Sequence, residues 1–302
     1  PKGRIQRLPI EPISQASANQ RAGRCGRNEP GIAIRLYEKL DFESRSSFTD
    51  PEIMRTNLAA VVLQCLDLKL GDPLKFPFVE PPEPKLVRDG LNQLKELNLI
   101  CQNGQLTTLG REVARLPLDP RIGRMLIEAI DRKVFWEVSI VAAVLTLQDP
   151  RESDFNLSEI NNSQSQFVTL LNLWILIDSQ RIKLSNSQFK KWCVSVGLSN
   201  NRVREWRDVH RQILLCFPQI KHQQLTLDAF DLKGFHIALL TAFSSNIGRL
   251  DNHNYQGIRN RKFNINKKTL GSKPRWVMAA ELVDTSRVIA RTVAKIEPRW
   301  VI

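Results

Sequence analysis

The feature that most constrains the fold of this chain is the helical spacing of apolar residues through its middle. Four segments repeat their apolar side chains with the period of an α-helix, and they are residues 121–132, 135–147, 167–177 and 203–217. The first two are predicted to be apolar on one face, while the polar residues 152–165 predict a loop. Because 42% of the 302 residues are hydrophobic, a sizeable core is possible. We expect a helical bundle over residues 119–233.

The segment before the bundle, residues 55–118, has the order helix, helix, hairpin. Apolar residues recur at helical spacing in residues 57–70 and again in residues 85–97. Asn103 and Gly104 stand between two short apolar runs and predict a tight hairpin turn in which both residues take positive φ. This order of elements is typical of a winged helix.

After residue 234 the pattern changes from helix to strand. One more helix is predicted over residues 235–245. The stretches W-V-M-A-A-E-L-V (276–283) and R-V-I-A-R-T-V-A-K-I (287–296) alternate and are rich in β-branched residues, as strands are. Four or five such strands close naturally into a small β-barrel, which we expect over residues 234–302.

Residues 1–54 hold too few elements to bury a core. A helix is predicted to begin within residues 14–20, and Gly31–Tyr37 alternates apolar and polar residues as a half-buried strand does. One helix and one strand suit the tail of an α/β domain that needs chain upstream, or a segment that is only partly ordered. The predicted fold class is therefore multidomain and mostly α with β.

The charge of the chain favours a polyanionic partner. It carries 44 Lys and Arg residues against 31 Asp and Glu residues, a net charge of +13. Such a field attracts RNA, DNA or an acidic membrane surface. No apolar run approaches the ~18 residues of a membrane span, and no long basic amphipathic helix is present, so nucleic acid is the favoured partner. A solvated basic surface is the alternative.

The cysteines and histidines argue against a metal site. Five cysteines are widely spaced without a C-x-x-C pair, and four histidines are scattered. This pattern favours neither a disulfide framework nor a zinc site, and it predicts a reducing cytoplasm. We expect no bound metal in this chain.

Residues 20–27, Q-R-A-G-R-C-G-R, suit phosphate binding. The planar fork of arginine matches phosphate oxygens in pairs, and glycine lets the backbone approach a ligand closely. Spacing of three places Arg21, Arg24 and Arg27 on one side of a helical turn. The alternative is an ordinary basic helix cap.

This stretch resembles motif VI of superfamily 2 helicases, Q-R-x-G-R-x-G-R, and the preceding S-Q-A-S-A-N narrows the resemblance to the DEAH-box group, in its bacterial HrpA-like form. Residues 49–64, 106–126, 202–213 and 273–287 resemble later segments of the same family. The resemblance implies four domains. They are the C-terminal part of a second RecA-like domain (1–54), a winged helix (55–118), a helical ratchet or HA2 bundle (119–233) and an OB-fold (234–302).

The resemblance also implies roles for the motif. Gln20, Arg24 and Arg27 would contact the terminal phosphate of ATP held with Mg²⁺ by the first RecA-like domain, and the two arginines would act as arginine fingers. The chain contains neither G-x-x-x-x-G-K-[ST] nor D-E-A-H. It is therefore expected to be the C-terminal half of an ATP-dependent RNA helicase, inactive alone, cytoplasmic and monomeric, with the missing RecA-like domain as its partner.

Single-stranded RNA, with DNA as an alternative, is the expected ligand of the bundle and barrel. Basic residues interleaved with aromatic rings suit such a strand, because cations follow phosphates and rings stack on bases. The candidate cations are Arg202, Arg204, Arg259, Arg261, Lys262, Lys267 and Lys268. Tyr255, Phe263 and Trp276 lie among them, although Phe263 and Trp276 are expected in the barrel core. A non-enzymatic nucleic-acid-binding module and a protein-interaction platform remain alternative functions.

Overall fold

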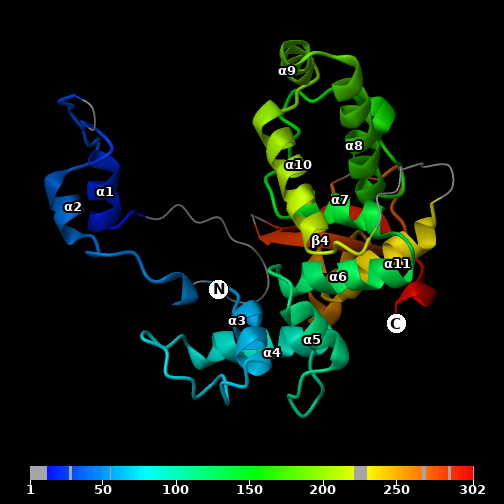
Figure 1. The fold of residues 1–302 in the computed structure, drawn as a ribbon, viewed down its shortest axis with the longest axis horizontal. Coiled ribbons are helices and arrows are strands. Elements are labelled where there is room, and N and C mark those ends of the chain that lie inside the picture. The colour runs from blue at the N-terminus through cyan, green and yellow to red at the C-terminus, as the bar shows by residue number, and fades with distance from the viewer. Residues whose placement is uncertain are drawn as a thin grey trace.

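A computed structural model describes residues 12–26, 29–54, 56–220, 230–266, 270–284 and 287–301. These residues are mostly helical, and one five-stranded sheet follows the helices in the chain (Figure 1). Of the predicted site residues, Arg27, Lys267 and Lys268 lie outside the described residues, as does the side chain of Arg259.

The N-terminal region, residues 12–54, is small and buries little. It contains α1 (Gln15–Ala22), α2 (Lys39–Ser44) and the short 3-10 helix η1 (Glu52–Met54). Helix α1 begins as predicted, because the side chain of Ser14 accepts a hydrogen bond from the Ser17 backbone N–H. Within this region only Ser14 and Ala18 are buried among the described residues.

The strand predicted over residues 31–37 is wrong for the described structure, in which this stretch has no regular structure. Its apolar side chains are open to solvent, with Ile32 exposed by 87%, Ile34 by 80% and Leu36 by 96%. A strand needs a neighbouring strand to take up its backbone hydrogen bonds. Every strand of the described sheet lies within residues 247–295, and none of them pairs with this segment.

Residues 56–118 form the predicted helices and hairpin around a small core of their own. The predicted helices are α3 (Ala59–Asp67) and α4 (Pro84–Glu96), and a third helix that was not predicted, α5 (Thr108–Ala114), follows the hairpin. A bridge from Ile100 to Leu106 confirms the hairpin. Its turn type was predicted wrongly, because only Gly104 takes positive φ (84°). The Cys101 N–H bonds to the Gln105 carbonyl, which leaves a three-residue loop that needs positive φ at its last position alone.

The helical bundle contains α6 (Pro120–Asp131), α7 (Phe135–Leu145), α8 (Gln166–Lys183), α9 (Asn186–Ser195) and α10 (Asn200–Leu215). Helix α7 was expected to be apolar on one face. It is instead central, and from Phe135 to Val144 every residue except Glu137 is buried. Helix α10 packs on it, and the Trp206 indole N–H donates to the Ile140 carbonyl at 2.8 Å. Residues 152–165 form the predicted loop apart from the short η2 (Ser158–Ile160).

Helix α11 (Leu232–Phe243) leads from the bundle into the antiparallel sheet and packs on α6. The strands are β1 (Ile247–Asp251), β2 (Asn254–Gly257), β3 (Lys262–Phe263), β4 (Trp276–Asp284) and β5 (Val288–Lys295), in the order β3-β2-β1-β4-β5. A parallel bridge from Asn264 to Ile289 joins the two edges. The sheet therefore curls until β3 meets β5, as a small barrel does.

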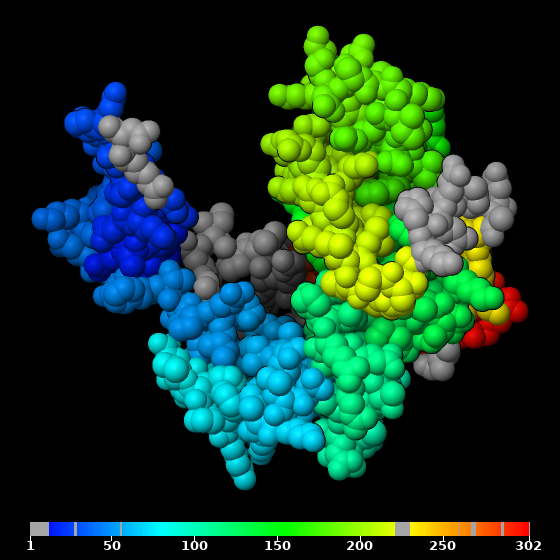
Figure 2. All heavy atoms as spheres, viewed as in Figure 1, coloured from blue at the N-terminus to red at the C-terminus, as the bar shows by residue number. Residues whose placement is uncertain are grey.

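The two faces of this sheet belong to different cores. Tyr255, Phe263 and Val277 point into the barrel, whereas Ile247 and Met278 join the core of the helical bundle. The bundle and the sheet therefore share one continuous apolar contact. Residues 12–54 are different, because on the face shown in Figure 2 their blue atoms do not touch the yellow-green atoms of α10.

Candidate nucleotide and nucleic-acid contact sites

The predicted phosphate-binding stretch lies at the end of α1. Gly23 closes the helix, and its backbone N–H bonds to the carbonyls of Asn19 and Arg21. The chain then turns, and Gly26 takes positive φ (77°). A side chain at Gly31 would come within 2.8 Å of the Gly26 backbone nitrogen. Glycine is therefore needed at both places, as a tight turn with closely approaching backbone requires.

The polar side chains of this turn are open to solvent. Gln20, Arg21 and Arg24 are all exposed, with Arg21 in the last turn of α1 and Arg24 in the turn after it. Among the described residues Arg24 makes no ion pair, so its guanidinium is free to contact a ligand. Arg27, the third arginine of the pattern, lies outside the described residues.

Residues that the sequence analysis did not single out support this turn. The Arg35 guanidinium donates to the Asn19 side chain at 2.6 Å and lies 4.2 Å above the Phe42 ring. The Gln15 amide donates to the carbonyls of Glu43 and Arg45. Helix α1 is thus held to α2 by polar and cation–π contacts instead of by an apolar core.

The bundle cations divide into paired and open groups. Arg202 donates to the Asp149 backbone carbonyl at 3.2 Å, and Arg151 forms an ion pair with the Asp149 carboxylate at 2.6 Å. Burial raises the pKa of Asp149, but the hydrogen bond and charge of Arg151, with the charge of Arg202, outweigh burial and leave that pKa lowered. Arg207 pairs with Asp178. Arg204 is exposed and has no ion pair among the described residues.

The barrel presents fewer of its predicted residues to solvent. Lys262 is exposed on β3, and the neighbouring Arg261 is half-buried. Tyr255 and Phe263 stack inside the barrel with their centroids 5.7 Å apart, which confirms the core position expected for Phe263. The Tyr255 hydroxyl donates to the Pro274 carbonyl, and burial raises its pKa to about 12. Neither ring can stack on a base.

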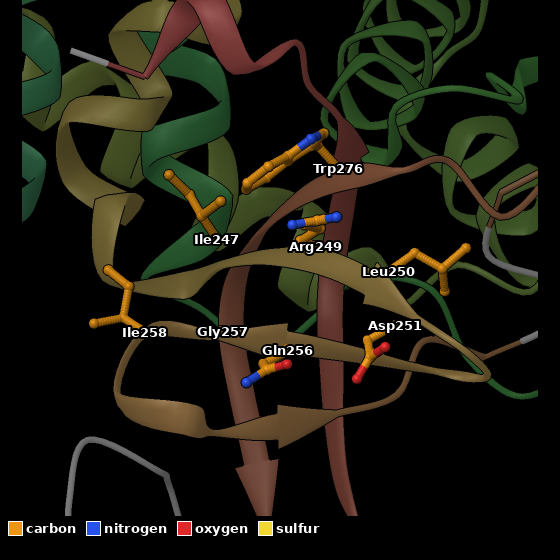
Figure 3. A pocket seen from close by; sticks show the side chains of 8 residues that line it. All are labelled: Ile247, Arg249, Leu250, Asp251, Gln256, Gly257, Ile258 and Trp276. Carbon is orange, nitrogen blue, oxygen red and sulfur yellow. The ribbon is translucent and has the colours of Figure 1, made fainter.

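Trp276 was expected in the barrel core, and this expectation is wrong. It packs from the outer face of the sheet against the bundle core and remains partly exposed. There it lines a cavity of about 530 Å³ together with Ile247, Arg249, Leu250, Asp251, Gln256, Gly257 and Ile258 (Figure 3). Of the three rings that lie among the candidate cations, Tyr255, Phe263 and Trp276, only Trp276 is therefore open to a ligand in the described structure.

The described residues show no group of three or more His, Cys, Asp or Glu side chains that could hold a metal ion. The five cysteines are free thiols. Among the described helices, none combines the length and the apolar composition that crossing a bilayer requires.

Comparison with known proteins places these features in a family. A model of the helicase-associated domain (HA2), described as ratchet-like, matches residues 119–192, and a model of the oligonucleotide/oligosaccharide-binding (OB)-fold matches residues 235–302. Over 99% of its length the chain is 44% identical to the ATP-dependent RNA helicase HrpA of Escherichia coli strain K12 and 42% identical to the HrpA homolog of Haemophilus influenzae. Over 70% of its length it is 36% identical to the probable ATP-dependent RNA helicase DHX34 of Mus musculus.

The chain spans about a quarter of the length of the HrpA relatives it matches, 24% in each case. It belongs to the HrpA-like DEAH-box RNA helicases and corresponds to a C-terminal region of them with HA2 and OB-fold domains.

Proposed function

We propose that this chain acts within an ATP-dependent RNA helicase, where its N-terminal region contacts ATP and its bundle and barrel hold a single RNA strand. The similarity to HrpA over 99% of the chain carries the proposal. The net charge of +13 supports it, because a basic surface attracts the phosphates of RNA.

The proposed division into domains follows the cores. Residues 1–54 would complete a second RecA-like domain, which the exposed side chains of Ile32, Ile34 and Leu36 support, since a sheet supplied by other residues would cover them. Residues 55–118 would be a winged helix, with helices and a hairpin around a separate core. Residues 119–233 and 234–302 would be the ratchet and the OB-fold.

The proposed role of the turn after α1 is to complete an ATP site. Gln20 and Arg24 offer exposed donors beside a close backbone turn, which fits the terminal phosphate of ATP. Arg24, together with Arg27, would stabilise the charge that develops during phosphoryl transfer. The P-loop and the Mg²⁺ ligands would come from another domain, because the chain has neither G-x-x-x-x-G-K-[ST] nor D-E-A-H. The purified chain is accordingly expected to release no phosphate from ATP, with or without RNA.

The proposed grip on RNA is mainly electrostatic and tolerates any sequence. Arg204 and Lys262 are exposed on the bundle and the barrel, and Arg261 adds a half-buried cation. Each phosphate that such a residue neutralises releases a counterion. The logarithm of the affinity for single-stranded RNA should therefore fall linearly with the logarithm of salt concentration, by about 0.7 per phosphate contact.

The test is a salt titration of RNA binding with matched variants. Converting Arg259, Arg261, Lys262, Lys267 and Lys268 to Ala should flatten the slope and weaken binding to all sequences alike. The control removes five exposed cations elsewhere, namely Lys39, Lys69, Lys75, Lys85 and Arg88. Equal flattening in both variants would show that net charge alone binds RNA. If the barrel variant binds RNA as the wild type does, the residues that contact the RNA phosphates lie outside this segment of the barrel.

A further inference from the structure

Three polar or aromatic side chains form a row across three neighbouring strands. Arg249 on β1 is directly opposite Gln256 on β2 and, on its other side, Trp276 on β4. Residues directly opposite each other in a sheet point to the same face. The register therefore brings these three side chains together although they are distant in the sequence, and Figure 3 shows them on one face of the sheet.

This face is the outer one, and although the bundle covers it at Ile247 and Met278, it is open to a ligand at Arg249 and Gln256. The residues that alternate with the row point inward, and Gly248 approaches the Phe263 ring so closely that an added Cβ would lie 2.4 Å from its Cζ atom. The row therefore points away from the barrel core. Arg249 is exposed, Gln256 is half-buried, and Trp276 is partly exposed.

Arg249, Gln256 and Trp276 line the cavity of about 530 Å³ shown in Figure 3. The position of Trp276 in this cavity suits a planar ligand. One part of Trp276 packs on the bundle core, so the ring is held in place by burial on that side. Ile258, exposed by 55%, adds an apolar wall at the same cavity. Pockets of roughly 300–1,000 Å³ with apolar walls and a few polar groups suit small planar ligands.

We propose that this cavity holds one unpaired nucleotide of a single-stranded RNA, with its base against Trp276. The proposal rests on the RNA-binding function proposed above and names a subsite for it. Arg249 would contact the adjoining phosphate, and the Gln256 amide can donate to and accept from the edge of a base. Asp251 lies two residues from Arg249 on the same face and is exposed. Phosphate avoids a carboxylate, so the strand passes on the other side of Arg249.

This contact differs in kind from the cations of the barrel. A base stacks on an aromatic ring through its π-face, which every base has, whereas a cation contacts the phosphate whether or not a base is attached. The Trp276 contact therefore depends on the presence of a base and depends little on salt. These two properties separate the subsite from the electrostatic grip.

The experiment compares two strands of equal charge. The purified chain is titrated with a ten-nucleotide adenylate RNA and with a ten-unit ribose-phosphate strand in which the middle bases are missing. For Trp276→Ala we expect affinity for the adenylate strand to fall by about 5- to 100-fold, since stacking on one ring has this effect in single-strand binders. Affinity for the strand without bases should not change. Trp276→Phe keeps a ring and should bind the adenylate strand nearly as wild type does.

Matched variants separate the possible failures. Trp192 is also half-buried against the bundle core, so Trp192→Ala controls for loss of packing and should leave both affinities unchanged. Arg249→Ala should lower the affinity for both strands alike, and it tests the phosphate contact without altering the bundle core.

Equal losses of affinity for both strands in Trp276→Ala, or no loss for either strand, would overturn the subsite while leaving the electrostatic grip intact. If the cavity binds a protein instead of RNA, Trp276→Ala should lose affinity for neither strand. A wild-type chain that binds neither strand would overturn the subsite together with the proposed RNA binding.

Discussion

The N-terminal region and the unit formed by bundle and barrel are stabilised in different ways. Residues 12–54 bury only Ser14 and Ala18 among those described, while Ile32, Ile34 and Leu36 stay exposed. In the bundle, by contrast, one apolar cluster runs from α6 through α11 and continues into the outer face of the sheet. Burial of apolar surface stabilises a domain in proportion to its area, so the second unit has most of the stabilising contacts.

Hydrogen bonds take the place of a core in the N-terminal region. The N–H groups of Gln15 and Ala16 bond to the carbonyls of Ser46 and Ser47, each at 2.9 Å. Each such bond contributes only about 0.5–1.5 kcal/mol net. The region can therefore present a turn with exposed donors, but it depends on further contacts to hold that turn rigidly. The proposed role of Arg24 as an arginine finger would require rigid placement, and we therefore expect the supporting contacts to come from outside residues 12–54.

The largest effect expected is on catalysis in the N-terminal region. In an intact helicase that contains this chain, Arg24→Ala should lower ATP hydrolysis by about 10³- to 10⁵-fold, because an arginine finger contributes that much to the rate. RNA affinity and the melting temperature should not change, since Arg24 is exposed and makes no ion pair among the described residues. Turnover is measured by phosphate release.

The exposed Lys39 of α2 is the matched control, and Lys39→Ala should hydrolyse ATP at the wild-type rate. Near-normal turnover of Arg24→Ala would mean that the turn after α1 does not face ATP. Equal losses in both variants would indicate a general effect of charge on the region.

The sequence predicted α6, α7, α10 and α11 to within three residues at each end, but it ended α8 at residue 177 instead of 183 and did not predict α5 or α9. Helix α6 matches its predicted segment within a residue at each end, because Pro120 begins the helix and its apolar residues face a single core. Helix α7 also lies where it was predicted, but it is covered on nearly all sides, so the expectation of a single apolar face was wrong. The strand at residues 31–37 failed for another reason. Its alternation is real, but alternation predicts a strand only where a neighbouring strand can pair with it.

The candidate site was predictable in part. The turn after α1 follows from a local pattern, so Gln20 and Arg24 could be singled out by resemblance. Trp276 was placed in the wrong core, because both faces of β4 are covered, one by the barrel and one by the bundle, and alternation does not tell them apart. Arg249 was missed, because only the register of three strands brings it beside Trp276.

The second prediction compares the two regions by core truncation. Trp206 is fully buried in the bundle, so Trp206→Ala should lower the free energy of unfolding by about 3–5 kcal/mol. Leu36 is 96% exposed, and Leu36→Ala should change that free energy by less than about 0.5 kcal/mol. Urea titration followed by circular dichroism measures both. A cost above 2 kcal/mol for Leu36→Ala would show that the N-terminal region has a core of its own.

The smallest expected effect concerns the contact between bundle and barrel, where His236 is buried on α11. Its two ring nitrogens bond to the Leu232 carbonyl and the Ser165 hydroxyl, each at 2.8 Å, and the ring stacks on Trp300. Ser165 also bridges to Ala294 on β5. The Nδ1 atom must donate to the carbonyl, and in the neutral ring that burial favours, Nε2 accepts from the Ser165 hydroxyl. Burial lowers the pKa of His236 from 6.5 to about 4.

This shift predicts that bundle and barrel lose stability in mild acid. Between pH 6.5 and about 4 the unfolded chain binds a proton at His236 and the folded chain does not, so stability falls as the pH falls. From pH 7 to pH 5 the loss from this group should be about 2 kcal/mol. His236→Gln should remove that part of the pH dependence in urea titrations, whereas His253→Gln, at an exposed position, should retain it. Identical pH dependence in wild type and His236→Gln would mean that this histidine is not held neutral in the folded chain and that the contact between bundle and barrel accommodates its positive charge.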